Sequence, residues 1–332
     1  MNRRDAMFAP LALGVATLAW AQTPGRIYRV GYLGYTATNT PDDARVWGGF
    51  VQRLRELGFV AGGNLAIEQR FAEGNNERYA AFAAEMVKLK ADVVVATSGA
   101  AARAVMAASP TLPIVTTAIA DPVRSGLVAN LARPGGQLTG ISNLADELVP
   151  KRLELLKAAL PAASRIAFAR CPRCALLGGL SAADLGALEV ERETAARSLG
   201  IKLLPLDVDD VADFDPATAA LRRERPDALL LGATQVNFAL GNRWLAFAAQ
   251  QRLPMLAPAR EFGAVLSYGP DSLAIFRKAA EYVAKILGGA RPGDLPMEQP
   301  TKFELVVNLR IAREIGLPVP QSLLLRADEV IR

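Results

Sequence analysis

Apolar runs of strand length alternate with amphipathic stretches of helical length along most of the chain. The runs at 92–96 and 114–119 are continuous and largely β-branched, which predicts strands covered on both faces. Between 41 and 57, in contrast, apolar residues recur at helical spacing behind Pro41 and two aspartates. Strands that alternate with helices in this way are typical of βαβ units and a parallel sheet. The pattern therefore predicts an α/β protein.

A second series of the same kind begins after Pro161. Strands are predicted at 165–169, 202–208 and 228–232, with helices at 187–199 and 219–225. The two series repeat one pattern, and 332 residues suffice for two domains of roughly 150 residues. We therefore expect two halves of one α/β plan, joined near Asn143. The remaining tail, with predicted helices at 271–287 and 306–315, is long enough to return to each half in turn.

The composition of the chain excludes several kinds of catalytic and metal site. The chain is 51% hydrophobic and 21% charged, which is ordinary for a globular protein. It contains no histidine, which excludes Ser-His-Asp and Cys-His catalytic sites and His-ligated metals. Two cysteines cannot form a four-thiolate zinc site. We expect no catalytic residue, metal or cofactor. The net charge is +5, but the basic residues are scattered among acidic ones and do not form a cluster. We therefore expect no nucleic-acid partner.

The amino terminus has the pattern of an export signal. Arg3 and Arg4 precede an apolar stretch from 7 to 21 that ends in Ala-Trp-Ala. This stretch is shorter than the roughly 20 residues that a membrane-spanning helix needs. We therefore expect residues 1–21 to be a signal peptide that is cleaved after Ala21, and the mature protein to be periplasmic and not membrane-spanning. The adjacent arginines leave the general and twin-arginine export routes both open.

Polar residues follow several predicted strands at the point where each strand ends. In open parallel sheets, ligands bind beyond the carboxyl ends of the strands, where the next helices begin. Several of these residues also have structural interpretations; Ser98 and Asp121, for example, stand where a helix start would need a cap. The candidate ligand-binding residues, including Asn143 at the junction of the halves, are Tyr35, Thr97, Ser98, Asp121, Asn143, Arg170, Gln235 and Glu261.

Cys171 and Cys174 form a Cys-Pro-Arg-Cys motif directly after the strand at 165–169. In an exported protein this spacing favours a local disulfide. The same motif resembles the active site of thiol oxidoreductases, which opens a helix. Gly178 and Gly179 are expected to interrupt any helix at this position. Free thiols, a ligand-contacting loop and an exported thiol oxidoreductase remain alternatives.

Motifs spread over the mature chain resemble one known family. The segments that carry the likeness are 68–74 (EQRFAEG), 119–123 (IADPV), 131–140 (LARPGGQLTG), 151–157 (KRLELLK), 266–271 (LSYGPD), 299–304 (QPTKFE) and 323–330 (LLLRADEV). The chain resembles the substrate-binding proteins of bacterial ABC importers with the type I periplasmic-binding-protein fold, in the subfamily that includes tryptophan and tyrosine binders.

The resemblance implies two Rossmann-like lobes with parallel sheets, joined by a multi-segment hinge, that enclose one small ligand. It places an N-terminal lobe at 27–142 plus about 271–298, and a C-terminal lobe at 143–270 plus about 299–332. The expected partners are a small molecule, such as an amino acid, and an ABC permease with its ATPase. We expect the protein to be a monomer and not an enzyme; a ligand sensor of the same fold without a transport role is the alternative.

For an amino-acid ligand, Thr97 and Ser98 with the following helix would hold the carboxylate. Asp121 or Glu261 would pair with the ammonium group, and Tyr35 would stack on the side chain. Members of the family commonly carry an Asn-Pro stretch where this chain has Cys171 to Cys174, so the ligand's identity does not carry over.

Overall fold

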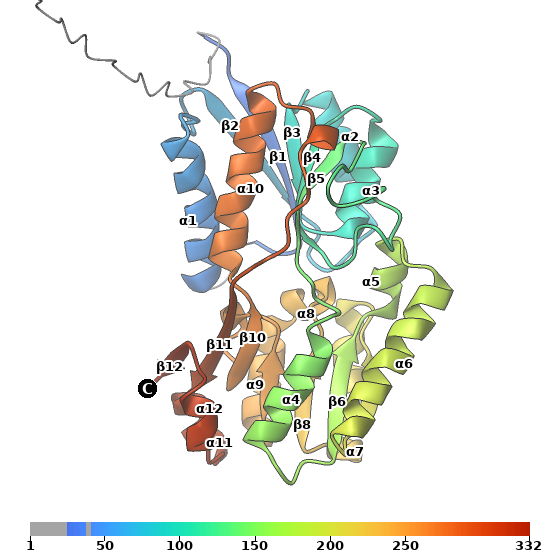
Figure 1. Ribbon diagram of the computed structural model, residues 1–332, viewed down its shortest axis with the longest axis vertical. Coiled ribbons are helices and arrows are strands. Elements are labelled where there is room, and N and C mark those ends of the chain that lie inside the picture. Colours follow the sequence, from blue (N-terminus) through green and yellow to red (C-terminus); the bar gives the residue numbers. More distant parts are fainter. Residues whose placement is uncertain (1–24, 38–40) are drawn as a thin grey trace, which may run out of the picture.

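The structure is a computed structural model that describes residues 25–37 and 41–332, and it consists of two α/β lobes (Figure 1). The N-terminal lobe is built on a five-stranded parallel sheet in the order β2-β1-β3-β4-β5. Its strands are β1 (Tyr28–Gly34), β2 (Leu65–Phe71), β3 (Val93–Ala96), β4 (Ile114–Ile119) and β5 (Leu138–Ser142).

Helices cover both faces of this sheet. They are α1 (Pro41–Glu56), α2 (Arg78–Lys88), α3 (Gly99–Ala108) and α10 (Ser272–Leu287), and Figure 1 shows α1 and α10 side by side. Val93 and Val95 pack in the cluster that contains α1 and α10, whereas Val94 and Ala96 pack with α2 and α3. Successive side chains of β3 point to opposite faces of the sheet, and helices cover both faces. Every residue of the strand is therefore buried and apolar.

The C-terminal lobe is built on a seven-stranded sheet in the order β12-β11-β10-β9-β8-β6-β7, in which only the β10–β11 pair is antiparallel. Its strands are β6 (Arg165–Arg170), β7 (Lys202–Asp207), β8 (Ala228–Leu231), β9 (Met255–Ala257), β10 (Leu266–Pro270), β11 (Phe303–Asn308) and β12 (Glu329–Ile331). Its α-helices are α4 (Val149–Ala159), α5 (Pro172–Leu177), α6 (Ala182–Ser198), α7 (Phe214–Glu224), α8 (Gln235–Ala239), α9 (Gly241–Gln251), α11 (Leu309–Ile315) and α12 (Gln321–Leu324).

Among the described residues, three short 3₁₀ turns complete the fold: η1 (Val211–Asp213), η2 (Arg260–Phe262) and η3 (Pro292–Asp294). The chain passes between the two sheets three times: after β5, after β10 and between η3 and β11. Arg152 ties two of these crossings together, because its Nε donates to the Tyr268 carbonyl at 2.9 Å and its Nη1 to the Ala145 carbonyl at 3.2 Å. The guanidinium is fully buried, which lowers its pKa to about 10.

The sequence-based prediction of a helix over 306–315 is wrong at its start. Residues 303–308 form β11, which pairs with β10, and the helix α11 begins only at Leu309. Val306 and Val307 suit a strand, and the Asn308 side chain caps α11 by accepting from the Ile311 amide at 3.1 Å. The predicted signal peptide, residues 1–21, lies outside the described residues. Within 25–37 and 41–332, the structure has no helix with the length and apolar character that crossing a bilayer requires.

Candidate functional site: a cavity between the lobes

Each sheet has one point where the strand order reverses, and both points open onto the same space. In the N-terminal lobe the reversal lies between β1 and β3, so Tyr35 and Thr97 follow the two strands that flank it. In the C-terminal lobe it lies between β6 and β8, so Cys171 and Gln235 lie beyond the corresponding strand ends. At such a point neighbouring connections leave on opposite faces of the sheet and create a crevice.

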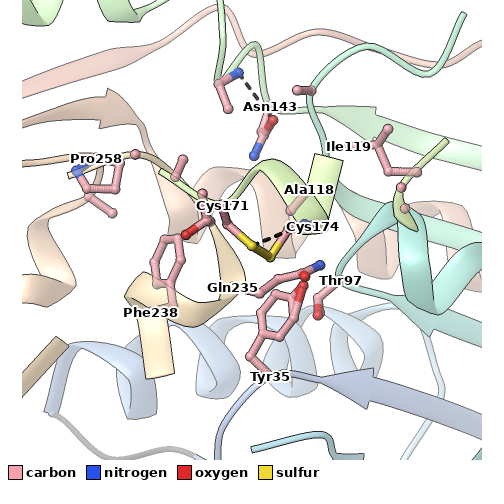
Figure 2. A pocket seen from close by; sticks show the side chains of 18 of the residues that line it. Tyr35, Thr97, Ala118, Ile119, Asn143, Cys171, Cys174, Gln235, Phe238 and Pro258 are labelled. Carbon is pink, nitrogen blue, oxygen red and sulfur yellow. Dashed lines mark hydrogen bonds between the residues drawn. A yellow bond between two sulfur atoms is a disulfide. The ribbon is translucent and has the colours of Figure 1, made fainter. Parts of the chain in front are cut away.

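A cavity of about 340 Å³ occupies this space, with walls from both lobes (Figure 2). Tyr35 and Thr97 reach it from the N-terminal lobe, and Gln235 and Phe238 from the C-terminal lobe. Aromatic residues form much of its apolar wall: Tyr32, Trp47, Phe71, Phe168, Phe238 and Phe276. A concave, largely apolar space with a few polar groups has the character of a small-molecule site.

Seven of the eight predicted ligand-binding residues line this cavity: Tyr35, Thr97, Asp121, Asn143, Arg170, Gln235 and Glu261. Ser98 does not line it. The Ser98 Oγ caps α3 by accepting from the Ala101 amide at 2.9 Å, and the side chain is buried. Of the two roles that the sequence allows for Ser98, the structure shows the helix cap.

Buried polar atoms without hydrogen-bond partners are concentrated at the cavity. Eight such side-chain atoms occur among the described residues, and six belong to residues that line it. They are Tyr35 Oη, Thr117 Oγ1, Ser125 Oγ, Arg192 Nε, Gln235 Oε1 and Glu261 Oε1. A buried polar group without a partner costs free energy, so such groups are normally satisfied. These atoms leave the cavity wall able to bond to a polar guest.

Thr117 is a cavity residue that the sequence reasoning missed. It lies inside β4, not after it, and its side chain is 2% exposed. The register of β4 against β5 shifts between Thr116 and Ile119. Such an irregularity changes the direction in which the neighbouring side chains point. The only signal in the sequence is a pair of threonines in an otherwise apolar run.

A network of ion pairs forms the C-terminal wall. Arg192 on α6 contacts Glu189 at 2.6 Å and Asp146 at 2.5 Å. Arg170 pairs with the same Glu189 and with Asp207, where Nε lies 2.6 Å from Oδ1. Because each guanidinium already has carboxylate partners, these arginines fix the wall more than they offer a free cation. Residues 189 and 192 face the cavity only because α6 packs there, which the sequence pattern does not reveal.

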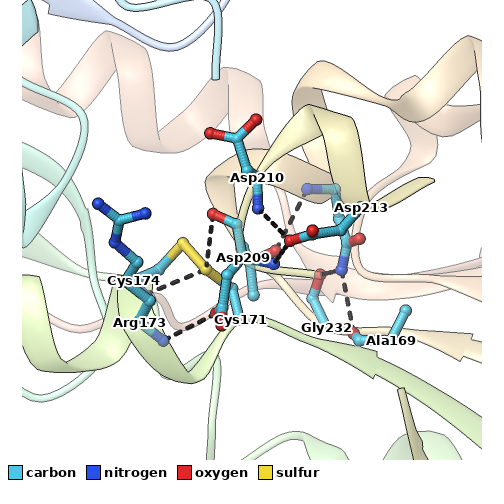
Figure 3. The surroundings of a disulfide bond; sticks show 10 residues. Ala169, Cys171, Arg173, Cys174, Asp209, Asp210, Asp213 and Gly232 are labelled. Atoms are coloured by element: carbon cyan, nitrogen blue, oxygen red, sulfur yellow. Dashed lines mark hydrogen bonds between the residues drawn. A yellow bond between two sulfur atoms is a disulfide. The ribbon is translucent and has the colours of Figure 1, made fainter. Parts of the chain in front are cut away.

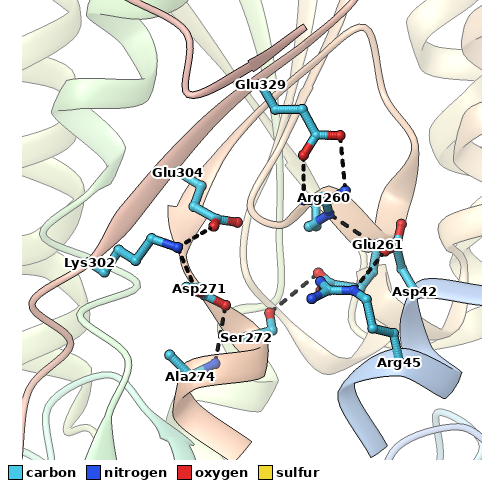
Figure 4. Close-up of polar contacts among 10 residues, drawn as sticks. All are labelled: Asp42, Arg45, Arg260, Glu261, Asp271, Ser272, Ala274, Lys302, Glu304 and Glu329. Carbon is cyan, nitrogen blue, oxygen red and sulfur yellow. Dashed lines mark hydrogen bonds and ion pairs between the residues drawn. The ribbon is translucent and has the colours of Figure 1, made fainter. Parts of the chain in front are cut away.

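Asp121 and Glu261 are the acidic candidates of the sequence analysis, and their surroundings differ. The Asp121 Oδ1 accepts from the Val123 and Arg124 amides at 3.1 and 2.9 Å, and Oδ2 lies 3.5 Å from Arg124 Nε. The Glu261 carboxyl accepts from Ser272 at 3.3 Å and lies 3.9 Å from Arg45 (Figure 4).

Burial raises the pKa of Glu261 to about 7, and Asp42 and Asp43 add to the shift. The Asp121 side chain at the cavity is partly exposed, whereas that of Glu261 is buried.

Cys171 and Cys174 are joined by a disulfide, and both line the cavity (Figure 3). The motif opens a short helix, α5, which runs from Pro172 to Leu177 and ends at the glycine pair, as expected. The Cys171 Sγ caps it by accepting from the Cys174 amide at 3.1 Å.

The two lobes touch at the rim of the cavity on both sides. On one side Asp42 and Arg45 of α1 face Arg260 and Glu261 of η2, with Arg260 Nε 3.5 Å from the Asp42 carboxylate (Figure 4). On the other side the Arg103 Nε of α3 donates to the Gly178 carbonyl at 3.2 Å. The structure therefore has the cavity between two lobes that touch at its rim.

Comparison with known proteins agrees with this geometry. A family model described as ABC transporter substrate binding protein matches residues 39–331. The chain belongs to this family. A tyrosine-binding protein of Clostridioides difficile (strain R20291) is 24% identical over 269 residues, which cover 78% of this chain and 73% of that protein.

Two solved structures resemble this substrate-binding protein over 92% of its length and over all of their own. A conserved domain protein of Vibrio cholerae O1 biovar eltor superposes with a TM-score of 0.81 at 28% identity. An ABC domain from Streptococcus pneumoniae, in complex with L-Trp, superposes with a TM-score of 0.79 at 22% identity. The expected fold, two α/β lobes of the periplasmic-binding-protein type, is confirmed.

Proposed function

We propose that this substrate-binding protein captures a free amino acid in the interlobe cavity, unchanged, and delivers it to the permease of an ABC importer. The observation that carries the proposal is the concentration of unpartnered buried polar atoms at an otherwise apolar cavity. A small guest with polar groups and an apolar body satisfies both features. Two similar proteins, a tyrosine-binding protein and a domain in complex with L-Trp, support the same class.

The carboxylate of the ligand fits best at the N-terminal wall. Thr117 presents an unpartnered hydroxyl group there, whereas the Thr97 hydroxyl lines the cavity but already donates to the Leu33 carbonyl at 3.0 Å. Gly99, the first residue of α3, also lines the cavity. The amides at a helix start are free to donate and lie at the positive end of the helix dipole. Ser98 contributes by fixing this helix start. The proposed carboxylate site therefore consists of hydroxyl and backbone amide groups and needs no acidic side chain.

The ammonium group pairs with the carboxylate of Asp121, which lines the same wall. Glu261 is the second candidate, but its raised pKa leaves it partly protonated near neutral pH. The aromatic residues of the cavity, with Tyr35, receive the side chain of the ligand. Gln235 and Asn143 complete the polar lining.

The proposal includes the organisation of the whole chain. The N-terminal lobe comprises 27–142 plus about 271–298, and the C-terminal lobe 143–270 plus about 299–332. The three crossings act as a hinge, and the ligand favours the closed state because it contacts both lobes only there. The protein acts in the periplasm as a monomer that binds without catalysis, with an ABC permease and its ATPase as partners.

Titration calorimetry with a panel of L-amino acids tests the proposal. We expect one or more to bind, and Asp121→Asn to weaken that binding at least about tenfold, because a charged hydrogen bond to the ammonium is lost. The matched control is Asp215→Asn, whose carboxylate is 84% exposed beside Arg243, away from the cavity. A panel without any binder contradicts the proposal; equal affinity in Asp121→Asn and the control overturns the assignment of Asp121.

A further inference from the structure

The segment from Cys171 to Leu180 belongs to the ligand cavity and to the lobe interface at once. It contains the disulfide, α5 and the glycine pair, and it follows β6, the strand beside the reversal point of the C-terminal sheet. Its cavity-lining members are Cys171, Pro172, Cys174, Ala175, Gly178 and Leu180. In Figure 1, α5 lies directly below α3 of the opposite lobe.

The same segment holds the opposite lobe at three points. The Arg173 Nη2 lies 3.3 Å from the Glu77 carboxylate. The Arg103 guanidinium donates to the Gly178 carbonyl. Gly99 packs against Gly178 so closely that a Cβ on Gly99 would lie 2.9 Å from the Gly178 Cα. These contacts join the two lobes in this structure, so we infer that the position of α5 affects closure.

The disulfide is a covalent restraint on α5. A six-residue helix is too short to be stable alone, and none of the residues of α5 is fully buried. Cys171, by contrast, is 4% exposed and packs in the hydrophobic core of its lobe. The bond to Cys174 therefore anchors a weakly packed helix to a rigid strand end. One further anchor is the Asp209 carboxylate, which accepts from the Arg173 amide at 2.8 Å (Figure 3).

We propose that the Cys171–Cys174 disulfide couples the redox state of the protein to its affinity for ligand. This inference rests on the proposed function. A dithiol reductant breaks the bond: the dithiol supplies two electrons and two protons, becomes a disulfide itself, and leaves two thiols on the chain. The reduced α5 loses its anchor, the cavity loses a fixed wall, and the closed state is populated less. The oxidised form is thus the high-affinity form.

Coupling of this kind is reciprocal. A ligand that binds the oxidised form more tightly must also stabilise the disulfide against reduction. If the affinities differ tenfold, the bound ligand makes the reduction potential about 30 mV more negative, because the couple transfers two electrons. The ligand therefore protects the bond that helps to hold it.

The experiment compares the wild type with the double variant Cys171→Ser/Cys174→Ser, using L-tyrosine as the probe. Serine at position 171 retains an acceptor for the cap of α5, so the variant removes the covalent bond and leaves the cap. We expect about tenfold weaker binding in the variant, within the usual range of coupling, and the same loss in wild type treated with dithiothreitol. Dithiothreitol should not affect the variant. Equal affinity of wild type and variant overturns the inference.

A measurement without ligand separates this inference from the proposed function. Hydrogen exchange of the α5 amides is expected to be faster in the variant and in reduced wild type than in oxidised wild type, while exchange in α3 stays the same. If L-tyrosine does not bind, the proposed ligand class is weakened, and the exchange of α5 still decides the role of the disulfide. Unchanged exchange in α5 overturns it.

Discussion

Among single residues, Glu261 has the most unusual surroundings. Its side chain is buried beside the rim contact of the lobes, with Arg45 at 3.9 Å and with Asp42 and Asp43 nearby. Ser272 donates to one of its oxygens. Burial raises the pKa of the carboxyl from 4.5 to about 7, so the folded protein holds a proton that the unfolded chain has already released.

This difference predicts a pH dependence of stability. Between pH 4.5 and 7 the folded state binds more protons than the unfolded state, so the free energy of unfolding falls as the pH rises through this window. The fall attributable to Glu261 is at most about 3 kcal/mol, and it is complete above pH 7. The Glu261→Gln variant lacks this contribution, so its free energy of unfolding increases relative to that of the wild type as the pH rises.

Urea unfolding at several pH values measures the effect. Glu154→Gln, at an exposed pair with Lys151, is the control and should follow the wild type throughout. Parallel curves for the wild type and Glu261→Gln between pH 4.5 and 7 would show that the proton is not held at Glu261.

The single residues also show where sequence reasoning about the site succeeds. Tyr35, Thr97 and Gln235 were predicted because they follow strands, and the strand order brings them to one cavity. Ser98 had two interpretations from sequence, and the structure gives it the cap. Thr117 was missed because the direction of a side chain within a strand depends on register, which is a tertiary property.

At the scale of elements, burial on both faces made some strands easy to predict. The bounds predicted for β4 agree with the structure, and β3 differs by one residue, because a strand covered by helices is apolar throughout. β11 was mistaken for helix because its pairing with β10 determines its conformation. α5 was not predicted because the disulfide and the contacts of its lobe, not its six residues, hold it.

The contact between α3 and the end of α5 leads to a test of closure. Gly99 is the first residue of α3, where alanine is at least as compatible with a helix as glycine. In the closed structure, however, an added Cβ would lie 2.9 Å from the Gly178 Cα and carbonyl oxygen, which are backbone atoms. We therefore expect Gly99→Ala to fold as well as the wild type and to bind L-amino acids roughly tenfold more weakly, as a closure-linked coupling allows.

Thermal unfolding and calorimetry measure the two effects of Gly99→Ala. The matched control is Gly186→Ala on α6, where an added Cβ meets no atom within 4 Å. The control should be about 0.5–1 kcal/mol more stable than the wild type, with unchanged binding. If Gly99→Ala binds with the affinity of the wild type, the close contact between Gly99 and Gly178 is not needed for ligand binding.

At the scale of the molecule, three crossings join the lobes and the rim contacts are few. Arg260 with Asp42, Arg103 with Gly178, and Arg173 with Glu77 are mostly partly exposed polar contacts. Exposed ion pairs contribute little stability each, about 0–1 kcal/mol. We therefore predict that such an interface does not hold the two lobes together on its own, and that a guest in the cavity favours the closed state.

Small-angle X-ray scattering with and without ligand tests this account most directly. L-tyrosine and L-tryptophan are added at saturating concentration, with binding verified by calorimetry in the same buffer. We predict that the ligand-free protein is more extended than the structure described here, and that the radius of gyration falls to the value of this structure when the amino acid binds. A scattering profile that stays the same while an amino acid is bound would contradict capture by closure of the two lobes.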